Sequence, residues 1–253
     1  LMNLLSSHKQ TLKIANTYAL KNMLNRKLAM PHFALFDLDN TLLIGDSDYA
    51  WGEYLCKHKV VDPVSFQKQN HDFYQDYVKG EMDSEAYYRF CLAPLVDNDE
   101  ASMKALRARY ISEVVEGMIS KQARALVDFH LSKGDVCVII TATQTFVVEP
   151  IAELFGVKHL IGTVPEYIDG KYTGKVEGTI CIKEGKLVKF KQWMEQHGYK
   201  KEEIEHITAY SDSINDLPLL NMAHTPVVVN PDPKLLAHAN EHGWQVLHFQ
   251  KDE

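Results

Sequence analysis

The spacing of hydrophobic residues changes at about residue 118, and this change separates two kinds of predicted structure. Residues 33–36 form a short, continuous apolar run that is typical of a buried strand. From residue 45 to residue 117, apolar and aromatic side chains recur at helical spacing, and Pro63, Gly80 and Pro94 separate about four predicted helices. No strand pattern interrupts this stretch, so we expect residues 45–117 to form an all-helical insertion.

Beyond residue 118, predicted strands and helices alternate. Apolar runs that are typical of strands in a parallel sheet occupy residues 136–140, 205–210, 226–229 and 245–248. The predicted helices between them cover residues 119–133, 145–156 and 185–198, and a further one begins at residue 217. Within residues 159–183, Asp169-Gly170 separates two alternating runs, which predicts a β-hairpin. The order of these elements predicts an α/β fold with a parallel sheet.

Composition narrows the class of protein. The chain has 253 residues, of which 45% are hydrophobic and 24% charged, enough for a buried core. Its net charge of −7 argues against a nucleic-acid-binding protein, and no apolar run is long enough to span a membrane. The 4 cysteines form no CxxC pair, so we expect neither disulfides nor zinc and place the protein in the cytoplasm. The sequence predicts no particular oligomeric state.

Residues 1–29 are rich in Leu, Lys and Asn, a composition compatible with an amphipathic helix, and they do not inform the chemistry. Three interpretations stay open: a flexible or docking extension, a basic targeting segment, or sequence upstream of a start at Met30. A secretory signal is not expected, because a continuous apolar segment is missing.

Carboxylates follow two of the predicted strands. Asp37 and Asp39 come directly after residues 33–36, and Asp212 and Asp216 follow residues 205–210. Because unpaired carboxylates beside a core are unfavourable, this placement predicts a compensating cation. The carboxyl ends of parallel strands are also where open α/β sheets bind ligands.

A hydroxyl group follows a third strand. Thr141 comes directly after residues 136–140, just before a predicted helix. We interpret it as a phosphate ligand; the alternative is a helix N-cap, a role that Thr145 could fill alone.

The run Asp37-Leu38-Asp39-Asn40-Thr41 resembles the first motif, DxDxT, of the haloacid dehalogenase superfamily. The order strand–DxD, helical insertion, strand–Thr, helix–Lys, strand–DxxxD is similar to the four-motif order of that family and covers residues 32–248. The resemblance is closest to the helical-cap branch that includes phosphoserine phosphatase. Residues 46–51 and 210–216 resemble a bacterial subgroup with histidinol-phosphatase-like members. Ser211 departs from the family pattern, which has Gly before the motif-four Asp.

The resemblance implies a fold and a domain organisation. We expect a Rossmann-like parallel sheet core over residues 30–44 and 118–253, with a helical cap over residues 45–117. It also implies a Mg²⁺-dependent phosphatase that acts on a small phosphorylated metabolite.

The resemblance assigns roles to the carboxylates. Asp37 would attack phosphorus and form an aspartyl-phosphate, and Asp39 would serve as general acid and base. Asp37, the backbone carbonyl of Asp39 and Asp212 would be Mg²⁺ ligands. Asp216 would hold a metal-bound water or orient its neighbours.

It also assigns phosphate-binding residues. Thr141 and Lys186 would bind the phosphoryl oxygens, with Lys189 as the alternative lysine. Asn215 would contact phosphate or support Asp212.

Substrate choice is expected to lie in the helical insertion. Asp46 or Asp48 would recognise a substrate ammonium; the alternative is that both cap the first helix, for which Ser47 is another candidate cap. Arg89 is available for a substrate carboxylate. These residues favour an amine-bearing ester, histidinol phosphate ahead of phosphoserine. A broad-range phosphatase and an inactive relative that binds phospho-ligands remain as alternatives.

Overall fold

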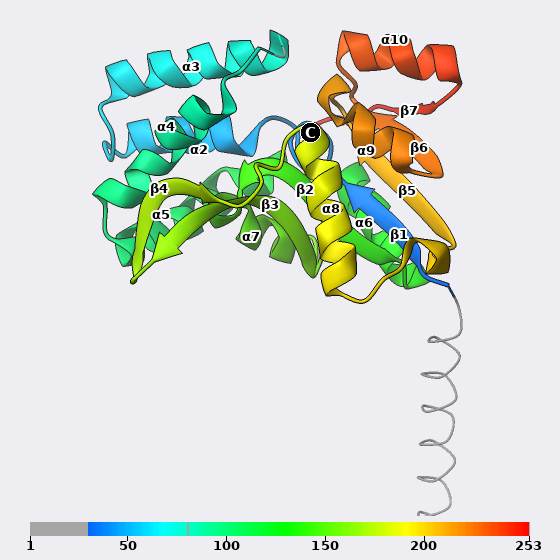
Figure 1. Cartoon of the computed structure of the whole chain (residues 1–253). Helices are drawn as coiled ribbons and strands as arrows, with labels where there is room; N and C mark the ends of the chain where they lie inside the picture. Colours follow the sequence, from blue (N-terminus) through cyan, green and yellow to red (C-terminus); the bar gives the residue numbers. More distant parts are fainter. Residues whose placement is uncertain (1–29, 80, 253) are drawn as a thin grey trace, which may run out of the picture.

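The computed structural model describes residues 30–79 and 81–252, and in this part of the chain one seven-stranded sheet has the order β4-β3-β2-β1-β5-β6-β7 (Figure 1). The strands are β1 (His32–Phe36), β2 (Val136–Gln144), β3 (His159–Ile168), β4 (Lys171–Glu177), β5 (His206–Ser211), β6 (Thr225–Val229) and β7 (Gln245–Leu247). Neighbouring strands are parallel except β3 and β4, which form the predicted hairpin through Asp169 and Gly170. The predicted α/β fold is therefore confirmed. The interpretations of residues 1–29 lie outside the described residues.

Helices cover both faces of the sheet. They are α6 (Lys121–Lys133), α7 (Thr145–Leu154), α8 (Glu184–Gln196), α9 (Leu217–Met222) and α10 (Pro233–His242). Ala34 and Phe36 of β1 belong to the core cluster shared with α6 and α7, whereas Phe33 and Leu35 belong to the cluster shared with α8, α9 and α10. Figure 1 shows α8 in front of the sheet and α6 and α7 behind it. Side chains alternate across a strand, so the continuous apolar run of β1 supplies both cores.

Residues between β1 and β2 form the expected helices. They are α2 (Ser47–Lys57), α3 (Pro63–Lys79), α4 (Ser84–Asp97), α5 (Glu100–Glu113) and the short 3₁₀ helix η1 (Val115–Met118). We call α2–α5 the helical insertion; its status as a separate domain stays a prediction. None of the described helices is both long enough and apolar enough to cross a membrane.

The prediction that Pro94 separates two helices is wrong. Pro94 lies inside α4, near its end, and its carbonyl oxygen accepts a hydrogen bond from Asn98 Nδ2 at 2.9 Å. The break falls at Asp99 instead, whose carboxylate accepts the N–H groups of Ala101 and Ser102 and caps α5. A helix-capping side chain therefore sets this boundary.

The order of strands changes direction at β1, which creates a topological switch point of the sheet. The chain reaches β2 and β3 on one side of β1, and it returns through α8 to place β5 on the other side. Ligands of open α/β sheets bind at such points, outside the carboxyl ends of the strands. Two further 3₁₀ helices, η2 (Lys201–Glu203) and η3 (Ile214–Asp216), flank β5.

Candidate active site

Lys186 lies between two carboxylates at the switch point. It sits in the first turn of α8, and its Nζ is 2.6 Å from Asp37 Oδ1 and 2.6 Å from Asp216 Oδ2. All three side chains are buried. Ser211 Oγ donates a further hydrogen bond to Asp216 Oδ2 at 2.7 Å. Residues predicted from three separate segments thus converge, and Asp216 is a second carboxylate partner of the lysine beside Asp37.

Asp212 lies close to Asp37 beside the same lysine. The Thr41 hydroxyl contacts both carboxylates, at 3.2 Å from Asp37 Oδ2 and 3.4 Å from Asp212 Oδ1. Burial raises the pKa of Asp212 well above its usual value, and the charges of Asp37 and Asp216 raise it further. Two carboxylates in such proximity favour either a shared proton or a bound cation.

This pair fits a hard divalent ion. The described residues contain no group of three His, Cys, Asp or Glu side chains placed to hold a metal, so side chains alone do not complete a coordination sphere. Mg²⁺ is usually bound by one or two carboxylates, with waters and substrate phosphate as the other ligands. Asp37 and Asp212 offer this donor set, and the Asp39 carbonyl oxygen is available in the same loop.

The carboxylate of Asp39 has hydrogen-bond partners of its own. Its Oδ1 accepts the backbone N–H of Ser47 at 2.6 Å, and its Oδ2 accepts the hydroxyl of Thr143 at 2.7 Å. Burial raises the pKa of Asp39 to about 6, and the charge of Asp46 contributes to the rise. A carboxyl group with a pKa in this range can both donate and accept a proton near neutral pH.

Thr141 lies beside these residues. It is buried, and its Oγ1 accepts the backbone N–H of Thr143 at 3.1 Å. The predicted strand end at residue 140 is wrong, because β2 continues to Gln144 after a register shift that begins at Ile140. Thr141 therefore lies within the irregular end of β2.

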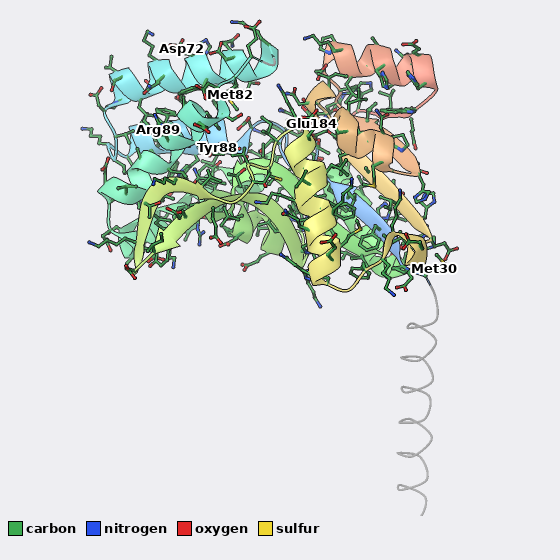
Figure 2. All side chains as sticks on the ribbon, viewed as in Figure 1. Met30, Asp72, Met82, Tyr88, Arg89 and Glu184 are labelled. Atoms are coloured by element: carbon green, nitrogen blue, oxygen red, sulfur yellow. The ribbon has the colours of Figure 1, made fainter. Side chains whose placement is uncertain are left out.

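A pocket opens from this group towards the helical insertion. Asp37, Asp39, Thr141 and Asp212 line its core side. Its lining from the helical insertion includes Asp46, Asp48, Tyr49, Asn70, Phe73, Tyr74, Met82, Tyr87 and Tyr88, of which Figure 2 labels Met82 and Tyr88. Among the described residues that line this pocket there is no Lys, Arg or His. The pocket therefore combines several carboxylates with aromatic walls.

Asp46 caps α2. Its backbone is extended, and its Oδ1 accepts the N–H of Tyr49 at 2.8 Å, so the prediction that Ser47 or Asp48 is the cap is wrong. Burial raises the pKa of Asp46 to about 6, partly opposed by the Tyr49 N–H. The N–H of Asp48 also contacts this carboxylate, and Asp46 still lines the pocket, where its charge can meet a ligand.

Asp48 lies inside the first turn of α2, where it has a different role. Its Oδ2 accepts the Tyr87 hydroxyl at 2.6 Å, and its Oδ1 accepts Gln144 Nε2 at 3.3 Å. Burial raises the pKa of Asp48 despite these donors. Asp48 therefore joins α4 to the end of β2 at the wall of the pocket.

The structure does not bring three predicted or alternative residues into this pocket. Arg89, labelled in Figure 2, is exposed on α4 and lines a separate depression beside Gly174 and Lys175. Asn215 lines a neighbouring cavity that shares Asn40, Tyr74 and Asp212 with the pocket. Lys189, the alternative lysine, is half-buried further along α8. Lys186 is thus the lysine that contacts Asp37.

Sequence reasoning missed four site residues, all of which act through hydroxyl groups: Thr41, Tyr87, Thr143 and Ser211. Thr41 belongs to the DxDxT run, so its position was a usable signal. Ser211 stands where the family pattern has Gly, a departure that could have suggested a new contact. Neither Tyr87 nor Thr143 has a comparable signal in the sequence.

Comparisons with known proteins identify the family of this chain. Residues 34–221 match the model of the haloacid dehalogenase-like hydrolase family. A histidinol-phosphatase of Neisseria meningitidis is 41% identical over 222 residues, which cover 87% of this chain and 100% of that protein. A phosphoserine phosphatase of Mycobacterium tuberculosis is 32% identical over 220 residues, covering 86% of this chain and 70% of that protein.

Solved structures show the same fold. A protein of unknown function from Bordetella pertussis has a TM-score of 0.82 and 40% identity, covering 87% of this chain and 99% of that one. A substrate-bound phosphoserine phosphatase complex has a TM-score of 0.61 at 17% identity, covering 87% of this chain and 93% of that one. At this identity the second likeness concerns the fold alone.

Proposed function

This chain is a phosphatase of the haloacid dehalogenase-like hydrolase family, and from that premise we propose that it hydrolyses a small, amine-bearing phosphate monoester through an aspartyl-phosphate on Asp37. Histidinol phosphate is the favoured substrate. The observation that carries the proposal is the meeting of Asp37, Asp212 and Lys186 at the end of β1.

In the first step, a carboxylate oxygen of Asp37 forms a bond to phosphorus while the bond from phosphorus to the ester oxygen breaks. The carboxyl group of Asp39 gives its proton to the departing oxygen, so that the alcohol leaves neutral. A pKa of Asp39 raised to about 6 suits this role.

In the second step, the Asp39 carboxylate takes a proton from water as the water oxygen attacks phosphorus. The bond between phosphorus and the Asp37 oxygen breaks, which releases inorganic phosphate and restores both carboxyl groups. The enzyme thus needs no other proton carrier.

The phosphoryl oxygens need positive charge and hydrogen-bond donors. Lys186 Nζ, 2.6 Å from Asp37, lies where it can contact a phosphoryl group on that residue. Thr141, buried at the end of β2, would offer its hydroxyl from the other side. Asn215 would act from the adjoining cavity, either on phosphate or as a support for Asp212.

A Mg²⁺ ion held by Asp37, Asp212 and the Asp39 carbonyl oxygen would neutralise charge on the phosphate and on the nucleophile. The proximity of Asp37 and Asp212 supports this site. Asp216 contacts Lys186 and Ser211, which supports an orienting role; a metal-bound water on Asp216 remains the alternative.

The composition of the pocket supports an amine-bearing substrate. A carboxylate on the substrate beside its phosphate, as in phosphoserine, would meet Asp46 and Asp48 with no Lys, Arg or His among the described lining residues. An ammonium group would relieve the same repulsion. The rings of Tyr49 and Tyr74, with centroids 5.3 Å apart, provide aromatic surface for a flat or cationic group.

Phosphoserine is the second candidate, because a relative in Mycobacterium tuberculosis bears that name. A screen of phosphate release with Mg²⁺ and with EDTA tests both. We expect the highest kcat/KM for histidinol phosphate, a lower value for phosphoserine and a still lower value for sugar phosphates. Comparable values for all esters would favour a broad-range phosphatase. No turnover of any ester by folded, Mg²⁺-loaded protein would favour an inactive phospho-ligand-binding relative.

A further inference from the structure

Two hydrogen bonds within the described part of the chain hold the Asp39 carboxylate, one on each oxygen, and their donors differ in kind. Ser47 offers its backbone N–H at the start of α2, which almost any residue could supply. Thr143 offers its side-chain hydroxyl at 2.7 Å from Oδ2. The second contact depends on the identity of residue 143.

Thr143 itself has little freedom to move. It is 5% exposed, and its backbone N–H donates to Thr141 Oγ1 at 3.1 Å. Its carbonyl oxygen faces Gly162 of β3, where an added Cβ would lie only 3.0 Å away. A β-branched side chain on such a fixed backbone has few rotamers, so the hydroxyl has a set direction.

Thr143 also connects two parts of the proposed reaction. Its N–H contacts the hydroxyl proposed for phosphate binding on Thr141, and its own hydroxyl contacts the proposed acid, Asp39. One residue therefore sets the spacing between the phosphoryl site and the group that must reach the ester oxygen. Both contacts arise in the irregular end of β2.

We propose that Thr143 is a positioning residue. It holds the carboxyl group of Asp39 so that the side of this group that Thr143 and Ser47 do not contact faces the leaving oxygen. This inference rests on the proposed function, because it assumes that Asp39 is the general acid. Together with the Ser47 N–H on the other oxygen, the hydroxyl would restrict rotation of the carboxyl group about its Cβ–Cγ bond. A carboxyl group held by the Ser47 N–H alone would spend less time aligned with the ester oxygen, and protonation of the leaving group would slow.

The dependence on the leaving group separates this role from a purely structural one. An alkyl ester such as histidinol phosphate leaves as a basic alkoxide and needs the proton. p-Nitrophenyl phosphate leaves as a weakly basic phenolate and needs it little. Because kcat/KM covers only the steps up to the first irreversible one, it reports on formation of the aspartyl-phosphate.

The test uses Thr143→Val, which keeps the shape and removes the hydroxyl, and Thr143→Ser, which keeps the hydroxyl. We expect Thr143→Val to lower kcat/KM for histidinol phosphate by about 10²-fold and for p-nitrophenyl phosphate by less than about threefold. Thr143→Ser should restore most of the loss. Thr143→Ala serves as a second variant if the valine variant does not fold, with the same expected contrast between esters.

Thr208→Val is the matched control. Thr208 is half-buried in β5, and its hydroxyl makes no hydrogen bond to another described residue, so both kcat/KM values should stay near those of wild type. Equal losses on the two esters, or a serine variant as slow as the valine variant, would overturn the role of Thr143. A wild-type enzyme that hydrolyses neither ester would instead refute the proposed function, and this inference with it.

Discussion

Lys186 is the residue on which the charge balance of the site depends. A buried ammonium group is unfavourable alone, and two buried carboxylates are unfavourable together; the contacts of Lys186 with Asp37 and Asp216 relieve both problems. Asp216 accepts from Ser211 as well, so it is fixed independently of substrate. The lysine is therefore placed before any phosphate arrives, which favours stabilisation of the transition state.

Lys186→Met should lower kcat/KM by about 10²–10³-fold, because it removes the cation beside the nucleophile. It should also lower the free energy of unfolding by about 3 kcal/mol, since Asp37 and Asp216 lose their common partner. Steady-state kinetics and urea unfolding measure the two effects. Lys189→Met, on the same helix, is the control and should change kcat/KM by less than about twofold. A Lys186→Met enzyme as active as this control would contradict the assignment.

Asp46→Asn separates substrate recognition from helix capping. Asparagine is as good an N-cap as aspartate, so the contact with the Tyr49 N–H and the stability of α2 should persist. The loss of charge should reduce the preference for histidinol phosphate over p-nitrophenyl phosphate by about tenfold, given that a charged hydrogen bond contributes about 1.5–3 kcal/mol. The ratio of the two kcat/KM values is the measurement.

Asp99→Asn provides a matched control for Asp46→Asn. Asp99 caps α5 with the same kind of contacts, but it is not among the residues that line the pocket. It should leave both the substrate preference and the melting temperature unchanged. If Asp46→Asn also leaves the substrate preference unchanged, Asp46 is a cap alone.

The charged residues of the site can be predicted from the sequence more readily than the neutral ones. Asp37, Asp212 and Lys186 stand at motif positions, and charged side chains are unfavourable in an apolar core unless they are paired. They were predictable for that reason. Thr143 and Tyr87 are ordinary residues for the end of a strand and the face of a helix. Their contacts depend on the direction of one hydroxyl group, which only the folded backbone defines.

At the scale of elements, the backbone at the start of α8 packs closely against the backbone of the preceding loop. Gly185 precedes Lys186, and a Cβ on it would lie 2.0 Å from the carbonyl oxygen of Ile180. Lys183, just before the helix, adopts a positive φ of 52°, which turns the chain into α8. The sequence predicted a helix beginning at Gly185, but this contact with Ile180 comes from the preceding loop and has no periodic pattern.

Gly185→Ala should displace the start of α8 and move Lys186 away from Asp37. We expect a loss of about 1–3 kcal/mol in the free energy of unfolding, as for other overpacked sites, together with lower turnover. Gly117→Ala is the control, because a Cβ there meets nothing within 4 Å. Thermal melts and p-nitrophenyl phosphate turnover compare the two variants. Equal behaviour of the two would show that the close contact has no consequence.

At the scale of the whole molecule, the helical insertion is attached to the sheet through polar contacts around the pocket. Tyr87 and Gln144 hold Asp48, and the Tyr88 hydroxyl donates to the carbonyl oxygen of Ala142 at 2.5 Å while it accepts from Thr163. The alternation of elements predicted the sheet and the insertion separately. How the insertion docks could not be predicted, because it depends on pairs of residues far apart in sequence.

The raised pKa of Asp48 makes the stability of the whole chain depend on pH. An acid whose folded pKa lies above its unfolded value of 3.8 destabilises the folded state as pH rises through that window. Asp48→Asn removes this penalty, so the variant should melt at a higher temperature than wild type at about pH 8. The difference should shrink towards zero below pH 3.8, where Asp48 is protonated in both states. A variant less stable than wild type at high pH would contradict this prediction.

The most direct test of the central claim is a search for phosphate on Asp37 itself. Excess enzyme is mixed with histidinol phosphate or p-nitrophenyl phosphate in a buffer that contains Mg²⁺, and the reaction is quenched rapidly in acid. The protein is then digested, and the masses of its peptides are measured by mass spectrometry. We predict that the peptide containing Asp37 gains the mass of one phosphoryl group early in the reaction, and that Asp37→Asn neither gains it nor releases phosphate. Release of phosphate by the Asp37→Asn variant at a rate close to wild type, or phosphate found on another residue, would contradict the account.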